Sequence, residues 1–451
     1  MPGWLDAVEA ELHAATRDEL VAQWAAETEA ERGTSGGGAV RLVALAAGDL
    51  CERLAERGAA REGAEARRCE LLHRRLLLAR VDGQPEIAAL VAELTLASWS
   101  AAAGDDARLA LLRGDGDRGR RERAWRERAA LGHKLWPRLR ELVERRNDAA
   151  RELGAASYYA FRLRLAELDV SEVDRALVEL GHASDAPWRE ARDALLAMVG
   201  AGPLAPWDLH LDPHGTGTLA SSWLPNAAEA AEAALRASGF ALPTERVRMD
   251  HGRPATFAID PPGDVRVLLP VGAGLARFRT ALHELGHALY AAGHDAALPW
   301  SLRDAPAPCL HEAVAKRISA LAGERAWLVA RGVPEHDAAR LADGVRHEQA
   351  IEARLLVLQV GLERALYEGA DPVASWQTLG MQHLGFDVRG SARAWARVPH
   401  LVLHPTLLAS YAVADGIAAG LRAAPEWLTS RIFRPGATWP WRELLARAAA
   451  R

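Results

Sequence analysis

The sequence has few cysteines, no long apolar run and no excess of positive charge, and each lack excludes a class of protein. Cys51, Cys69 and Cys309 are the only cysteines and no CxxC pair occurs, which argues against a disulfide-stapled secreted domain. No apolar run approaches the roughly 20 residues that a membrane-spanning helix needs. The formal net charge is −5, without a basic stripe or tail, so we expect no nucleic-acid partner.

The first 20 residues also lack the features of a secretory signal. They are amphipathic and acidic, without a positive n-region or an apolar core. We therefore expect a cytoplasmic protein with no membrane partner. The 451 residues, 49% hydrophobic and 25% charged, are typical of a globular protein and suffice for one large helical domain or two lobes.

The most informative stretch is the HExxH motif formed by His283, Glu284 and His287. On a helix, the two histidines lie four residues apart on one face, where both imidazoles can bind one zinc ion. Glu284 can then act as a general base that takes a proton from the attacking water. The alternative is an ordinary amphipathic helix with two histidines that bind no metal.

A catalytic zinc site needs a third protein ligand and an open fourth position. The candidate is Glu312, which follows His287 by 25 residues, enough for a helix end, a loop and a second helix. The Ala- and Leu-rich surroundings of the motif predict a buried helix. Together these features favour a zinc hydrolase over the amphipathic-helix alternative.

The remaining sequence is mostly helical in pattern. Asp169 and Glu172 predict a capping box at the start of a helix. The Arg-rich run 118–128 predicts a solvated helix face, and the Pro- and Gly-rich residues 201–225 predict a crossover between two helical halves. The β-rich segments 255–259 and 265–269, separated by a turn, predict a hairpin beside the HExxH helix.

A second segment with catalytic potential contains His400, His404 and Tyr411. A tyrosine hydroxyl or a histidine N–H can stabilise the oxyanion that forms during amide hydrolysis. From spacing alone, Tyr411 is better explained as a core aromatic and His404 as a helix-cap or turn residue.

Several segments together resemble the angiotensin-converting-enzyme-like and oligopeptidase group of zinc peptidases, the gluzincins whose third ligand is Glu. They occur in the same order as in that group, between about residue 135 and about residue 440: residues 145–159, 206–213, 263–267, HELGHALY at 283–290, 298–303 with Glu312, 395–400 and 405–411.

The resemblance implies a mainly α-helical ellipsoid of two halves around a deep channel, with a small β-hairpin or sheet beside the zinc helix. It implies Zn²⁺ bound by His283, His287 and Glu312, and hydrolysis of short or unfolded peptide substrates. Glu284 would be the general base and Tyr411 would stabilise the oxyanion. His400 would assist, with His404 as the rival for that role.

Three departures from the group concern substrate binding. Val398 and Leu407 stand where the dipeptide-releasing members carry a Lys and a Tyr that hold the substrate's C-terminal carboxylate, and Ala255 stands where they carry a substrate-contacting His. Peptidyl-dipeptidase specificity is therefore not expected to carry over, whereas the zinc chemistry is.

We expect one catalytic domain over residues 1–451, with residues 1–130 as an N-terminal, lid-like helical part and residues 131–451 as the helical core with the HExxH site. Two alternative functions stay open. One is a dedicated maturation protease for one small cognate peptide. The other is a non-catalytic binding scaffold that retains its zinc site.

Overall fold

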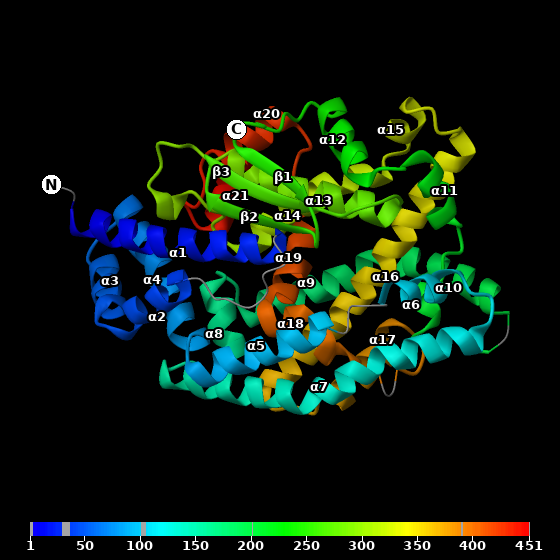
Figure 1. Cartoon of the computed structure of the whole chain (residues 1–451), viewed down its shortest axis with the longest axis horizontal. Helices are drawn as coiled ribbons and strands as arrows, with labels where there is room; N and C mark the ends of the chain where they lie inside the picture. The colour runs from blue at the N-terminus through cyan, green and yellow to red at the C-terminus, as the bar shows by residue number, and fades with distance from the viewer. Residues whose placement is uncertain (1–2, 29–36, 101–104, 201, 389–390, 451) are drawn as a thin grey trace. The chain divides into compact units, whose positions relative to one another are not determined.

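The computed structural model describes residues 3–28, 37–100, 105–200, 202–388 and 391–450 (Figure 1). The chain divides by its internal packing into two compact units. Unit 1 comprises Met1–Gln84, Ala220–Trp327 and Ile417–Arg451, and unit 2 comprises Pro85–Leu219 and Leu328–Gly416. The chain passes from unit 2 into unit 1 inside the predicted crossover 201–225. The single catalytic domain with a lid-like part at residues 1–130 stays a prediction.

Unit 1 contains helices from three parts of the chain and a small sheet. Its elements are α1 (Trp4–Thr28), α2 (Gly37–Ala47), α3 (Leu50–Ala59), α4 (Gly63–Asp82), α12 (Ala227–Ala237), β1 (Val247–His251), β2 (Ala255–Asp260), β3 (Asp264–Leu269), α13 (Leu275–Ala292), η2 (Trp300–Leu302), α14 (Pro308–Ser319), η3 (Ala320–Gly323), α20 (Pro425–Leu428), η5 (Thr429–Phe433) and α21 (Trp441–Ala449).

In the described part of unit 2, all the regular elements are helices. Its elements are α5 (Pro85–Ser100), α6 (Asp105–Gly114), α7 (Arg118–Glu152), α8 (Tyr158–Leu165), α9 (Val170–Ala183), α10 (Asp185–Val199), η1 (Asp208–His210), α16 (Glu335–Glu368), α17 (Pro372–His383), η4 (Ala392–Arg397) and α18 (Pro399–Leu403). Three helices run across the unit boundaries: α11 (Thr216–Trp223), α15 (Arg325–Ala330) and α19 (Leu407–Gly420). No helix among the described residues is long and apolar enough to cross a bilayer.

The predicted mainly α fold with a small sheet is confirmed. The expected hairpin is present as β2 and β3, which pair antiparallel, with Thr256 opposite Val267. The sequence did not indicate β1, which pairs in parallel with the other edge of β3 and gives the order β1-β3-β2. Helix α13 packs against both β2 and β3, so the sheet lies beside the HExxH motif.

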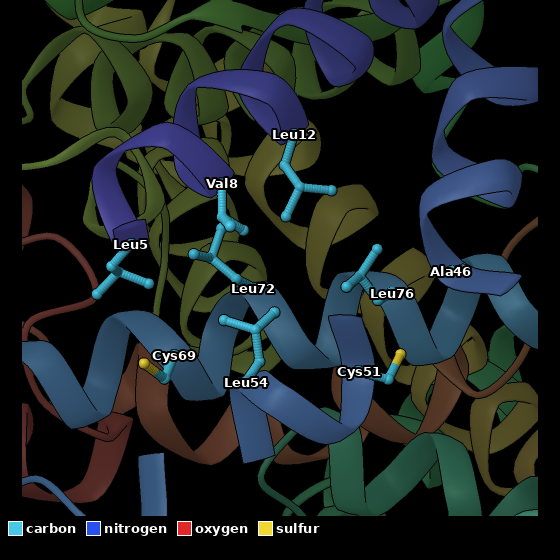
Figure 2. Packing of buried hydrophobic residues seen from close by; sticks show 9 residues of the cluster. All are labelled: Leu5, Val8, Leu12, Ala46, Cys51, Leu54, Cys69, Leu72 and Leu76. Carbon is cyan, nitrogen blue, oxygen red and sulfur yellow. The ribbon is translucent and has the colours of Figure 1, made fainter. Parts of the chain in front are cut away.

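The first four helices build a hydrophobic core of their own within unit 1. Figure 2 shows the buried side chains that meet there from α1 to α4: Leu5, Val8, Leu12, Ala46, Cys51, Leu54, Cys69, Leu72 and Leu76. Two of the three cysteines are therefore small apolar core residues, in keeping with the absence of a disulfide framework in the sequence.

Helix α1 is also joined to the loop that precedes α14. The buried carboxylate of Glu9 accepts a hydrogen bond from the Ser301 backbone N–H at 2.5 Å and one from Arg68 Nε at 3.0 Å. The ring of His13 stacks on Trp300 with 4.8 Å between centroids. The N-terminal helix therefore fixes the chain close to the start of the helix that carries Glu312.

Two predictions on unit 2 have different outcomes. The capping box is confirmed, because Asp169 accepts from the Glu172 backbone N–H and Glu172 accepts from that of Asp169. The solvated face of residues 118–128 is wrong in part, because Arg121 is buried and donates to Asp208 Oδ1 at 2.9 Å. Asp208 lies 87 residues further along the chain, so its pairing leaves no local signal in the sequence.

Helices α13 and α14 approach each other closely at Gly286. A Cβ atom at this position would lie 2.8 Å from the Cα of Ala315 on α14 and 3.2 Å from the Cβ of Ile318. Glycine therefore lets the backbones of α13 and α14 come together. This contact sets the separation between the two helices that carry the candidate metal ligands.

We predict that Gly286→Ala lowers stability by about 1–3 kcal/mol, because the added methyl group overpacks the α13–α14 contact. The midpoint of thermal unfolding and the zinc content should both fall. Gly416→Ala is the matched control, since that helical glycine has open space around it and alanine favours a helix. Equal midpoints for Gly286→Ala and the wild type would show that the helices tolerate a wider separation.

Candidate metal centre and catalytic residues

Helix α13 presents the two motif histidines to the same space. His283 and His287 are one helical turn apart, and their Nε2 atoms lie 3.1 Å from each other. Their rings are nearly perpendicular, at 85°, with 4.6 Å between centroids. Two Nε2 atoms aimed at one point are suited to binding a shared cation.

Glu312 on α14 brings a carboxylate to that point. Its Oε2 lies 3.4 Å from His283 Nε2 and its Oε1 lies 3.7 Å from His287 Nε2. A zinc ion held tetrahedrally at about 2.0–2.1 Å would keep its donors about 3.3–3.4 Å apart. The three donors form the one group with metal-binding geometry that was found among the described residues, and they fit a zinc ion without rearrangement.

Burial also suits the donors to a metal. The side chains of His287 and Glu312 are almost inaccessible to solvent. Burial, with smaller effects from His311 and His283, lowers the pKa of His287 well below its usual value. The imidazole is therefore neutral near pH 7, which is the form that binds zinc.

His311, which lies outside the motif, packs on the His287 ring, and two further aromatic residues lie nearby. His311 stacks on His287 with 4.1 Å between centroids and an angle of 23°, and Tyr290 lies against His311 at 5.7 Å. His294 is buried and its Nδ1 lies 2.9 Å from the backbone oxygen of Phe433. The sequence analysis missed these three residues, although each lies on or directly beside a motif helix.

Glu284 is held by a residue that the sequence analysis also missed. The hydroxyl of Thr256 on β2 lies 2.8 Å from Glu284 Oε2 and 3.0 Å from the Glu284 backbone oxygen. Burial raises the pKa of Glu284, against the opposing effects of His283 and of the Thr256 hydroxyl. A buried carboxylate with a raised pKa and a fixed orientation is well suited to accept a proton.

Thr256 is the strand residue next to Ala255, which the sequence resemblance aligns with a substrate-contacting His. Successive strand residues point to opposite faces, so Ala255 and Thr256 cannot share one environment. The contact between Thr256 and Glu284 joins residues 28 positions apart. Only the pairing of the sheet with α13 brings them together.

The second predicted pair lies in unit 2. His400 is on α18, Tyr411 is on α19, and His400 Nε2 lies 3.3 Å from the Tyr411 hydroxyl. The rings of His400 and His404 are 6.1 Å apart between centroids. Val398 is the N-cap residue of α18 and Leu407 is the first residue of α19. The roles of all these residues stay predictions.

Comparison with known proteins identifies relatives by structure alone. No family model and no curated protein sequence matches this chain. A crystal structure of M32 carboxypeptidase from Deinococcus radiodurans R1 superposes with a TM-score of 0.64 at 18% identity, covering 99% of this chain and 95% of that one. Trypanosoma cruzi metallocarboxypeptidase 1 matches with a TM-score of 0.66 at 13% identity, over 99% and 95%.

A third neighbour is PZ peptidase A in complex with an inhibitor. It matches with a TM-score of 0.72 at 12% identity, covering 99% of this chain and 93% of that one. At such identities the likeness establishes a shared fold that extends over nearly the whole chain. The neighbours are metallocarboxypeptidases and a peptidase, and they do not single out the angiotensin-converting-enzyme-like group.

We predict that Glu312→Gln loses tightly bound zinc, because the substitution removes the anionic donor from the group. Loss of a residue that only supports a ligand weakens metal binding about 10–100-fold. Loss of the proposed ligand Glu312 should weaken zinc binding by more than this. The measurement is zinc content by mass spectrometry after dialysis against a mild chelator. Glu284→Gln is the control and should keep one zinc per chain, so equal zinc in the two variants would remove Glu312 from the ligand set.

Proposed function

We propose that this protein is a zinc-dependent metallopeptidase that hydrolyses short or unfolded peptides. The observation that carries the proposal is the convergence of His283, His287 and Glu312, with Glu284 held beside them by Thr256. Shared fold with metallocarboxypeptidases and a peptidase supports it. The sequence motifs that resemble those of the oligopeptidase group also support it.

Each residue has a proposed task in the hydrolysis of the peptide bond. Bound Zn²⁺ supplies a Lewis acid that polarises a carbonyl and lowers the pKa of water. The Glu284 carboxylate takes the proton from the attacking water and later delivers it to the leaving amine. Thr256 keeps one carboxylate oxygen of Glu284 oriented during both transfers.

Tyr411 and His400 are proposed to stabilise the oxyanion of the tetrahedral intermediate by donating hydrogen bonds. Their 3.3 Å contact shows that the two side chains lie together. If His400 Nε2–H donates to the Tyr411 oxygen, the Tyr411 O–H stays available to donate to the oxyanion. We assign the histidine role to His400 and keep His404 as its rival.

The part of the site that binds the C-terminus of the substrate is proposed to differ from that of the dipeptide-releasing peptidases. The side chains of Val398 and Leu407 are apolar and cannot bind a C-terminal carboxylate as Lys and Tyr side chains do. Two of the structural neighbours are carboxypeptidases, so removal of single C-terminal residues is one outcome to test. A cytoplasmic location and the absence of nucleic-acid and membrane partners stay predictions from the sequence.

The test of the function is cleavage of a quenched-peptide library by purified zinc-loaded protein, with products read by mass spectrometry. Glu284→Gln should keep its zinc and lose about 10²–10⁴-fold in kcat, because the general base is removed. Turnover at the wild-type rate in that variant would sink the mechanism. Zinc without any cleavage in the wild type would favour a protease for one cognate peptide or a binding scaffold.

We predict a separate effect for Thr256. Thr256→Val keeps the side-chain shape but removes the hydroxyl that contacts Glu284, so kcat should fall about 10–100-fold with the zinc content unchanged. Thr256→Ser keeps the hydroxyl and should recover most of the activity. If the Val and Ser variants are equally active, the hydrogen bond has no part in orienting the base.

A further inference from the structure

The chain between His400 and Tyr411 runs through two helices that a turn at residues 404–406 separates. Helix α18 is only five residues long, and α19 begins at Leu407. Between them, Thr406 adopts a φ of +67°. For a β-branched residue this left-handed conformation is strained, and it persists only where the surroundings enforce it.

Glu363, near the end of the long helix α16, enforces the conformation of Thr406. Its side chain is buried, and its Oε1 accepts a hydrogen bond from the Thr406 backbone N–H at 2.7 Å. Burial raises the pKa of Glu363 to about 7, while the Thr406 N–H, Arg162 and Arg146 act in the opposite direction. Burial thus favours the neutral carboxyl, whose carbonyl oxygen can still accept this hydrogen bond, so an uncharged acceptor can replace it.

Arg146 on α7 holds the other side of the segment. Its guanidinium is buried and donates from Nη2 to the Val402 backbone oxygen at 2.8 Å and from Nη1 to that of Leu401 at 3.4 Å. These are carbonyls near the C-terminus of α18, where a cation is favoured. The guanidinium also lies over the ring of Tyr158, 5.2 Å from its centroid.

The contacts of both buried charged residues with this segment run to its backbone. Arg146 binds the chain just after His400, and Glu363 binds it just before α19, which carries Tyr411. Neither contact depends on the side chains of residues 401–406, so the sequence of the segment itself gives no sign of them. Apolar side chains could fill the same space at a lower desolvation cost than Arg146 and Glu363. Packing alone therefore does not account for these two residues.

We propose that Arg146 and Glu363 are positioning residues, which hold residues 399–411 so that His400 and Tyr411 keep the geometry needed to act on the oxyanion. The inference rests on the proposed function, because it assigns that action to His400 and Tyr411. Arg146 and Glu363 themselves act through the backbone and contact no reacting atom.

Two variants of Glu363 separate positioning from simple core packing. Glu363→Met fills the same space without an acceptor, and kcat should fall about 10–100-fold while KM changes less than about twofold and zinc stays at one per chain. Glu363→Gln keeps the acceptor and should restore kcat to within about threefold of the wild type. Glu368→Met is the matched control on the same helix, since Glu368 pairs with Arg364, and it should keep wild-type kcat.

Arg146→Lys tests the other contact in a variant that keeps the positive charge. A lysine cannot bind two carbonyls in one plane as a guanidinium does, so the same split between kcat and KM is expected. Wild-type kcat in both Glu363→Met and Arg146→Lys would overturn the proposal. A fall in kcat that Glu363→Gln does not reverse would also overturn it for Glu363.

Hydrogen exchange at the Thr406 amide gives a readout that needs no activity. It should be slow in the wild type and at least about tenfold faster in Glu363→Met, with no change in Glu368→Met. Unchanged exchange in Glu363→Met would overturn the proposal whatever the protein cleaves. If the wild type cleaves no peptide, the proposed function fails, while accelerated exchange still supports the holding of the segment by Glu363.

Discussion

The candidate metal centre depends on how closely two helices can approach. Three donors on α13 and α14 lie within 3.1–3.7 Å of one another, and a larger side chain between the two backbones would push these helices apart. Gly286 removes that obstacle, since the space for its missing Cβ is filled by Ala315. The motif therefore contains both the ligands and the residue that allows the third ligand to reach them.

The second constraint is the desolvation of charge. Glu284, Glu312 and Glu363 are all buried, and each would be costly in an apolar core without a compensating partner. Thr256 donates a hydrogen bond to Glu284, and the Thr406 backbone N–H donates one to Glu363. Glu312 instead faces the imidazoles of His283 and His287. A cation at that point would offset the cost of burying this carboxylate, which is the physical reason to regard the group as a metal centre.

The parts that could be predicted from the sequence are those with local signals. Helical spacing placed His283 and His287 on one face, and the β-rich segments around a turn predicted the β2–β3 hairpin. Glu312 followed from the family resemblance and from a plausible distance along the chain. These predictions needed no knowledge of how remote segments pack.

The parts that were missed depend on remote contacts. Strand β1 pairs in parallel with β3, and Thr256 reaches Glu284 only through packing of the sheet on α13. Arg121 looked like a solvated arginine because its partner, Asp208, is 87 residues away. Arg146 and Glu363 bind backbone atoms of a distant segment, and such contacts leave no pattern in the sequence of either partner.

The bond between Glu9 and Ser301 has a consequence for the order of assembly. It joins positions 292 residues apart, and Arg67 reaches the backbone oxygen of Ala437 across 370 residues. During synthesis, α1 leaves the ribosome long before its partner Ser301 exists, and Ala437 is made later still. Closing such long loops carries an entropic cost before any contact compensates for it. The contact of Glu9 can therefore form only after residue 301 has been made, and that of Arg67 only after residue 437, so α1 and α4 wait for partners that are synthesised much later than they are.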